Sequence, residues 1–311
     1  MSMPAHHFDP SIPDPALLVP VQRLTRDLAL ANANLTPDEA RFLVDAYYQM
    51  QENRIRTAGQ TRSMDGSKEP HATLHWLTYQ SETLENQIKR ALAQYAESQP
   101  LGEWALAQIG IGPVITAGLL AHIDFEPWKC FAPLPRPKDH VCKAGEPCTA
   151  QCGPTRIETV GHIWRFAGLD PTVTWGKGEK RPWNASLKTL CWKIGESFTK
   201  VSNNPDAVYG RLYKERKALE EARNARGEFA AQAAAALAAK KFRADTQARA
   251  HYEAGRLPPA HVHARAKRYA VKIFLAHYHE VGYTLLTGHA PPAPYPIAIG
   301  GHAHKIEVPK G

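Results

Sequence analysis

The chain has 311 residues, enough for two domains or one large one, and its hydrophobic content of 43% can build a core. A formal charge of +8 favours a polyanionic partner. We find neither a run of about 18 apolar residues that predicts a membrane span nor the basic and apolar regions of a secretory signal. We therefore expect no membrane contact and a cytoplasmic, nucleoid-associated location.

Helical patterns dominate and strand patterns are scarce, so the predicted fold class is mostly α. Residues 1–70 are expected to form a Pro-rich arm and an N-terminal helix that begins at Thr36 and Pro37, with a polar loop from residue 56. A long coiled-coil-like helix is expected over 71–100, with 72–97 as its helical part. Its three-four apolar spacing suits packing on another helix or homodimerisation: Leu74, Leu77, Leu84, Ile88, Leu92 and Tyr95.

Residues 101–122 predict a helix-hairpin-helix whose two short helices meet at 109–113. Gly110 and Gly112 allow a positive φ, and Pro113 suits the first position of a helix. The free N–H groups at that helix start can hold a phosphate oxygen without reading base sequence. The alternative is an ordinary turn that contains Gly-x-Gly. The residues expected at the contact are Gly110, Ile111, Gly112, Val114 and Thr116, with Ile111 also anchoring the turn in the core.

Beyond the hairpin, the pattern predicts a Cys-rich insertion over 127–155, then a helix near 159–167 and a loop over 176–184. The next helix has one apolar face, and helices are expected over 206–250 and 261–286 with a break at 255–259. A tail over 287–311 is expected to be disordered or docked. The apolar face consists of Leu187, Leu190, Cys191, Ile194 and Phe198.

The string IGIGPVITAGLLAHI, the turn FAGLDP at 166–171, and the basic loop and helix after it resemble a known family. The family they resemble is that of the Piv-invertase-like insertion-sequence transposases, in its C-terminal domain. These are the DEDD-type elements, some of which are guided by a bridge RNA. The resemblance covers about residues 72–286, and the hairpin-containing domain is expected over 101–286. It implies DNA binding, transposition and DNA recombination, on DNA that is branched or carries RNA.

Two departures from that family bear on catalysis. The residues before 71 show no βαβ pattern for the family's N-terminal RuvC-like domain, which a separate partner would then have to supply. Trp175 stands where the family has its nucleophilic serine. The remaining hydroxyl candidates are Thr174 and Ser186, and Ser186 also suits a helix cap. We therefore expect a protein that is not an enzyme alone and that needs Mg²⁺ only if it cleaves DNA.

Four of the five cysteines lie in the Cys-rich insertion. Four thiolates, or three with His140, would satisfy a tetrahedral structural Zn²⁺, and a Pro- and Gly-rich segment without its own core gains stability from such a site. The alternative is a loop with free thiols. The predicted ligands are Cys130, Cys142, Cys148 and Cys152, with His140 as a substitute.

Two basic patches can hold a phosphate backbone, although each could also be a solvated helix face. The first combines Lys177, Lys180, Arg181, Lys188 and Lys193 with Trp175, Trp183 and Trp192. The second comprises Lys240, Lys241, Arg243, Arg249, Arg256, Arg265, Lys267, Arg268 and Lys272. The expected contacts are Lys177, Lys180, Arg181, Lys188, Arg265, Lys267 and Arg268.

The C-terminal fifth is rich in histidine, and we expect these residues at the surface: His261, His263, His277, His279, His289, His302 and His304. Three functions remain open at this stage. The chain is a DNA-binding protein related to a transposition system, an active transposase or recombinase with an unfamiliar nucleophile, or a helical scaffold for protein interactions. Salt-dependent binding separates the first from the last.

Overall fold

The computed structural model describes residues 25–63, 72–125, 128–130, 152–154, 157, 159–239, 242–243, 245–294 and 305–310. The chain divides into two compact units, Met1–Ser98 and Gln99–Gly311. The fold is mostly helical, as the sequence predicts. None of the described helices has the length and apolar content needed to cross a membrane.

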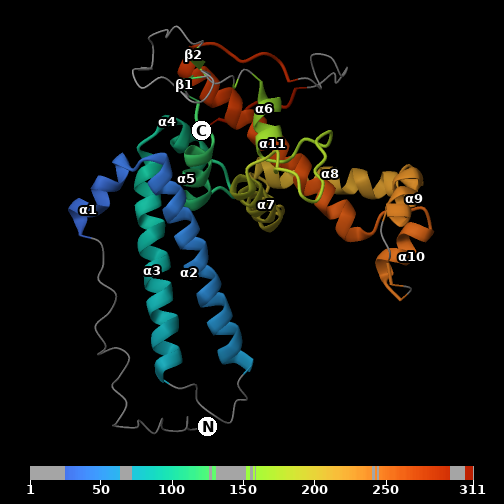
Figure 1. Ribbon diagram of the computed structural model, residues 1–311, viewed down its shortest axis with the longest axis horizontal. Coiled ribbons are helices and arrows are strands. Elements are labelled where there is room, and N and C mark those ends of the chain that lie inside the picture. Colours follow the sequence, from blue (N-terminus) through green and yellow to red (C-terminus); the bar gives the residue numbers. More distant parts are fainter. Residues whose placement is uncertain are drawn as a thin grey trace. The chain divides into compact units, whose positions relative to one another are not determined.

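The first unit is built around two long helices that lie side by side (Figure 1): α2 (Pro37–Ser63) and α3 (Ala72–Glu97). They follow the short α1 (Arg26–Ala31) and the 3₁₀ turn η1 (Asn32–Asn34). The predicted start of α2 is confirmed. Thr36 N donates to Glu39 Oε2 at 2.8 Å and Glu39 N donates back to Thr36 Oγ1 at 3.3 Å, which is a capping box.

Helix α2 extends beyond its predicted end, because residues 56–63 belong to the helix and not to the predicted loop. Thr57 is buried and its hydroxyl donates to Asn53 O at 2.8 Å, so this polar segment continues the helical ladder. Across to α3, Arg54 Nε lies 2.6 Å from Glu85 Oε2. This ion pair is a polar contact between the two helices.

Helix α3 has the bounds that the sequence predicts for it, but its predicted apolar residues are unequally covered. Leu92 and Tyr95 are buried, whereas Leu77 is 43% exposed. Tyr79 is also exposed. The coiled-coil character of α3 and homodimerisation through residues 72–97 therefore stay predictions.

The second unit is organised around α11 (Pro259–Thr287), which packs against α4 (Pro100–Leu106), α6 (Val160–Phe166), α7 (Ala185–Lys200) and α8 (Val208–Ala225). Stacked and edge-on aromatic rings fill the core between α11 and its neighbours, with centroid distances of 5.1 Å for Phe198–Tyr209 and for Tyr209–Phe274. The predicted apolar face of α7 is confirmed, since all five of its residues are buried.

The remaining elements of this unit are helices α5 (Pro113–His122), α9 (Ala230–Ala239) and α10 (Gln247–Glu253), and strands β1 (Trp128–Cys130) and β2 (Cys152–Pro154). The strands pair antiparallel, with Cys130 opposite Cys152. The sequence did not predict them, because three residues are too few to show alternation. The predicted break at 255–259 is confirmed, since α10 ends before it and α11 begins at Pro259.

The described end of the tail, residues 305–310, is docked on the second unit, which confirms one of the two predicted alternatives. Trp104 Nε1 donates to Pro309 O at 3.1 Å, and Lys305 Nζ lies 2.7 Å from Glu280 Oε1. These contacts tie the chain end to α4 and α11.

The expectation that the C-terminal histidines lie at the surface is wrong for His277 and His279, which are 3% and 2% exposed. His277 Nε2 donates to Ile306 O at 2.9 Å, so Nδ1 is left to accept from the hydroxyl of Tyr209, also at 2.9 Å. His279 Nε2 donates to Ile157 O at 2.8 Å. Helical periodicity places both residues on α11, but only the packing of other segments over α11 buries them. His302 and His304 lie outside the described residues.

Candidate nucleic-acid interface

The predicted hairpin is present as α4, a turn, and α5, whose first residue is Pro113. Gly110 has φ of +99°, the left-handed conformation that glycine adopts readily. Gly112 differs from the expectation, because it is extended at φ −106° and ψ 174° and caps α5. Ile111 is buried, so it anchors the turn in the core as predicted.

The turn rests on the end of α7. Ser197 Oγ donates a hydrogen bond to Gly110 O. A Cβ at Gly110 would lie 3.3 Å from a ring carbon of Phe198 and 3.2 Å from a methyl carbon of Val201. Residue 110 is therefore held close to α7, while a Cβ at Gly112 would meet open space.

The start of α5 can offer only backbone groups to a phosphate at two of the predicted positions, because the side chains of Val114 and Thr116 are buried. Thr116 N already donates to Gly112 O at 3.0 Å and the Thr116 hydroxyl is buried, so neither group is open to a phosphate. The N–H of Val114 belongs to the first turn of the helix, where no intrahelical acceptor exists.

The loop between α6 and α7 begins at Gly168, whose φ of +65° ends α6. Leu169 N donates to Trp164 O at 2.8 Å and Gly168 N donates to Arg165 O at 3.0 Å, which is a Schellman motif. A Cβ at Gly168 would lie 2.9 Å from carbons of both Trp183 and Lys188. Glycine is thus required here for these two side chains to cover the turn.

Internal hydrogen bonds shape this loop. Asp170 Oδ1 accepts from the N and Oγ1 of Thr172 at 2.9 and 2.7 Å, which holds the pKa of Asp170 below its usual value. Trp175 Nε1 donates to Glu179 O at 2.8 Å, and Gly176 N donates to the Glu179 carboxylate at 2.8 Å. The Trp175 ring is therefore fixed by its own turn.

Cations and tryptophans are interleaved where the loop enters α7. The Trp175 and Trp183 rings meet edge-on at 6.1 Å. The Arg181 guanidinium lies 5.3 Å from the Trp175 ring centre, and Lys188 Nζ lies 3.9 Å from that of Trp183. Lys177 and Lys180 are exposed in the same loop. The ring faces lower the cost of holding positive charge at these positions.

Arg268 of α11 joins this group although it lies far away in the sequence. The pKa of Lys188 is lowered by partial burial and then by the charges of Arg181 and Arg268. The pKa of Arg268 is lowered by burial and then by Arg265. Within the described ranges, no carboxylate forms an ion pair with Arg181, Lys188 or Arg268. We call these three residues the cationic face.

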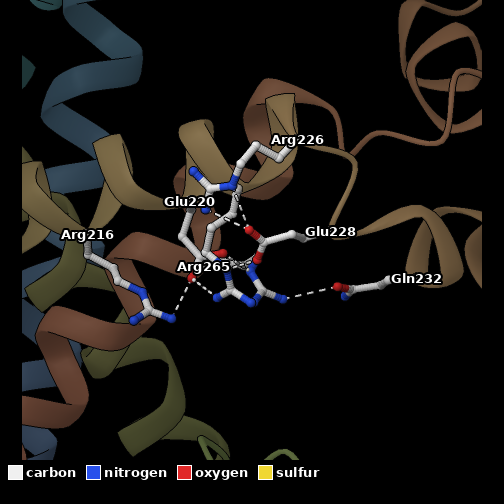
Figure 2. A network of polar contacts seen from close by, with 7 residues as sticks. Arg216, Glu220, Arg226, Glu228, Gln232 and Arg265 are labelled. Carbon is white, nitrogen blue, oxygen red and sulfur yellow. Dashed lines mark hydrogen bonds and ion pairs between the residues drawn. The ribbon is translucent and has the colours of Figure 1, made fainter.

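Two predicted contacts on α11 already have intramolecular partners. Arg265 Nε lies 2.8 Å from Glu220 Oε2, and Arg265 also donates to Gln232 Oε1 at 3.1 Å, as Figure 2 shows. Lys267 pairs with Glu196 and its side chain is only 13% exposed. A nucleic-acid phosphate would have to displace these acceptors, so we leave Arg265 and Lys267 out of the interface.

Glu220 is the centre of the network in Figure 2 and its side chain is fully buried. Arg216 Nη2 lies 2.5 Å from Glu220 Oε1. Burial alone would raise the pKa of Glu220, but Arg265 and Arg216 together lower it. Next to it, Glu228 pairs with Arg223 at 2.7 Å and with Arg226 at 2.6 Å. This network links α8, α11 and the start of α9 and has a structural role.

Other members of the second basic patch lie beside carboxylates or a tryptophan ring. Arg243 pairs with Asp245 at 3.5 Å, and Arg249 pairs with Glu253 at 2.6 Å. Lys272 Nζ lies 4.1 Å from the ring centre of Trp164. Lys240 and Lys241 lie outside the described residues.

The two candidate nucleophiles, Thr174 and Ser186, are both exposed. Ser186 is not the helix cap, because Asn184 Oδ1 accepts from Leu187 N at 2.9 Å and fills that role for α7. Among the described residues, no cluster of three or more His, Cys, Asp or Glu side chains could hold a metal ion. A role for Thr174 or Ser186 with Mg²⁺ stays a prediction.

The predicted zinc site falls largely outside the described residues, which contain neither His140, Cys142 nor Cys148. Cys130 and Cys152 are described as backbone positions that pair in register between β1 and β2. The Zn²⁺ site therefore stays a prediction.

No family model, curated protein or solved structure matches this chain. The resemblance to insertion-sequence transposases, the DNA partner and a RuvC-like partner accordingly stay predictions that rest on the residues alone.

Proposed function

We propose that this protein binds nucleic acid, DNA in the first instance, through the phosphate backbone and with the cationic face as its main contact. The observation that carries the proposal is a group of cations without a paired carboxylate in the described part of the chain: Arg181 and Lys188 lie over tryptophan rings at the start of α7, and Arg268 lies on α11, which packs against α7. Cations that repel one another lose that repulsion when phosphates come between them.

The hairpin supplies a second contact of the same chemistry. The first turn of α5 has backbone N–H groups at a helix N-terminus, where the helix dipole favours an anion. Ser197 ties Gly110 to α7, the helix that also holds Lys188. Both contacts address phosphates, so we expect binding without base-sequence preference.

The experiment is a fluorescence anisotropy titration of a labelled DNA duplex at rising NaCl concentrations. Each lost phosphate contact lowers the slope of log K against log salt by about 1, so Lys188→Gln with Arg268→Gln should reduce it by about 2. The matched control is Lys214→Gln with Arg249→Gln, which removes two charges elsewhere in the same unit. If the cationic-face variant keeps the wild-type affinity and slope, the proposal is wrong.

The resemblance to transposases suggests the process in which the proposed binding takes part. In transposition or DNA recombination, this chain would hold the DNA and a separate partner would cleave it. The alternative of an active transposase is tested by incubating supercoiled and branched DNA with the protein and Mg²⁺. Nicking that Thr174→Ala or Ser186→Ala abolishes would replace the non-catalytic proposal. If no DNA is bound even at low salt, the helical protein-interaction scaffold becomes the better account.

A further inference from the structure

Two tryptophans near the cationic face remain open to solvent and are not explained by phosphate binding. Trp192 on α7 is 59% exposed and Trp175 in the loop is 43% exposed. Trp183 differs, because it lies against Gly168 under the Lys188 side chain. Large exposed rings beside cations are the chemistry that stacks on nucleic-acid bases.

Resting on the proposed nucleic-acid binding, we propose that this surface takes single-stranded nucleic acid, with unpaired bases stacked on Trp175 and Trp192 and phosphates on the cationic face. In a duplex the base faces are covered by their neighbours, and only edges and phosphates are accessible. Rings therefore add affinity only where bases are unpaired.

Trp175 is suited to stacking because its turn fixes the ring before any ligand arrives. Its Nε1 donates to Glu179 O, and the Glu179 carboxylate accepts from Gly176 N. Trp183 meets its ring edge-on and Arg181 lies over the ring. A pre-positioned ring loses little side-chain freedom on binding, so more of the stacking energy appears as affinity.

Trp192 continues the same track along α7. It follows Lys188 by four residues, so the two side chains lie on one face of the helix, about 6 Å apart along its axis. Lys267 Nζ of α11 lies 5.7 Å from the centre of the Trp192 ring. Trp192 therefore adjoins Lys188 on α7, while Trp175 adjoins Arg181 in the loop before this helix.

The track is short. Asn184, which caps α7, and Trp192 are separated by about 12 Å along the helix. Two rings and three cations on so short a surface suit a strand of about four nucleotides, the lower end of the site sizes known for single-strand binding folds. Sequence preference is not expected, because every base presents a stackable face.

The experiment compares labelled single strands, oligo(dT) and oligo(U), with a duplex of the same length, using the full chain. Trp175→Ala with Trp192→Ala should weaken single-strand binding about 10-fold or more, and duplex binding by a clearly smaller factor, because Arg181 also loses its contact with the Trp175 ring. Trp192→Phe should recover part of the loss, because it restores a ring. Trp76→Ala, which removes an exposed tryptophan from α3, is the matched control and should change neither.

Far-UV circular dichroism of each variant excludes loss of fold as the cause. A loss on either single strand that clearly exceeds the loss on the duplex supports the proposal. If the double tryptophan variant binds both single strands as the wild type does, or loses duplex binding equally, the single-strand proposal is overturned. The proposed function fails separately, through wild-type binding by the Lys188→Gln and Arg268→Gln protein.

Discussion

The hydroxyl of Ser197 donates a hydrogen bond to the carbonyl oxygen of Gly110, so the end of α7 supports the turn between α4 and α5. Lys188 lies nine positions earlier on the same helix, about 14 Å away along the axis. One rigid helix therefore holds both proposed phosphate contacts at a fixed separation. Disturbing the turn should affect folding and binding together, whereas removing charge from Lys188 should affect binding alone.

Gly110→Ala is expected to destabilise the protein by about 1–3 kcal/mol, because φ is +99° and the new Cβ would crowd Phe198 and Val201. Urea unfolding measures the change. Gly112→Ala is the matched control, because residue 112 has an ordinary extended φ and open space around its Cβ. Its expected change is smaller, about 0.5–1 kcal/mol, because alanine is a poorer N-cap than glycine. Equal losses in the two variants would contradict this account of the turn.

Local signals were sufficient for most of the helical fold. Thr36 and Pro37 marked the start of α2, Pro113 that of α5, and the apolar spacing of α7 identified the face that is buried. Each of these depends on residues within a few positions of one another, as helix caps and helical periodicity do. Three-residue strands such as β1 and β2 carry no comparable signal.

Long-range packing decides which cations at the site come together and which are paired with carboxylates, and the sequence alone does not predict this. Arg268 and Lys188 are 80 positions apart, and their meeting depends on how α7 packs against α11. The same packing gives Arg265 and Lys267 their carboxylate partners, Glu220 and Glu196. Charge patterns alone could not distinguish these paired cations from unpaired ones, since both kinds lie within one basic stretch.

Glu220→Gln is expected to destabilise the second unit by about 2–4 kcal/mol, because two arginines would keep their charge beside a buried neutral amide. This expected loss is smaller than the full cost of breaking a buried ion pair, since the Arg216 and Arg265 side chains are about a quarter exposed. Thermal unfolding followed by circular dichroism gives the change.

Glu221→Gln is the neighbouring control for Glu220. Its partner Lys217 lies 3.6 Å away, and both side chains are largely exposed. Such pairs contribute less than about 1 kcal/mol, so little change is expected. A Glu221→Gln effect as large as that of Glu220→Gln would show that burial does not decide the outcome.

Stability should fall in mild acid because of His277 and His279. Burial is the main cause that lowers the pKa of each below its ordinary value of 6.5. The unfolded chain therefore binds more protons than the folded chain once the pH falls below about 6.5. Above that pH each histidine makes its full contribution to the free energy of unfolding. Below it, the free energy of unfolding falls by up to about 1.4 kcal/mol per pH unit for each histidine, until the pKa of the folded state is reached.

Urea unfolding at pH 7.5, 6.5 and 5.5 measures this dependence. His277→Gln should be less stable at pH 7.5, because the contacts to Tyr209 and Ile306 are altered, but it should have a shallower acid loss. His289→Gln changes an exposed histidine and should retain the wild-type slope. A wild-type slope in His277→Gln as well would disprove a buried neutral imidazole at this position.

The predicted zinc site can be tested by metal content. We expect about one Zn²⁺ per chain by inductively coupled plasma mass spectrometry, lost in Cys142→Ser with Cys148→Ser, because a structural site needs four ligands. Cys191→Ala is the control and should retain zinc, since Cys191 is buried on α7 and burial raises the pKa of its thiol to about 12. A thiolate, not a thiol, binds the metal. Purified wild-type protein that contains no zinc, or a double variant that retains it, would leave the cysteines of the insertion as free thiols.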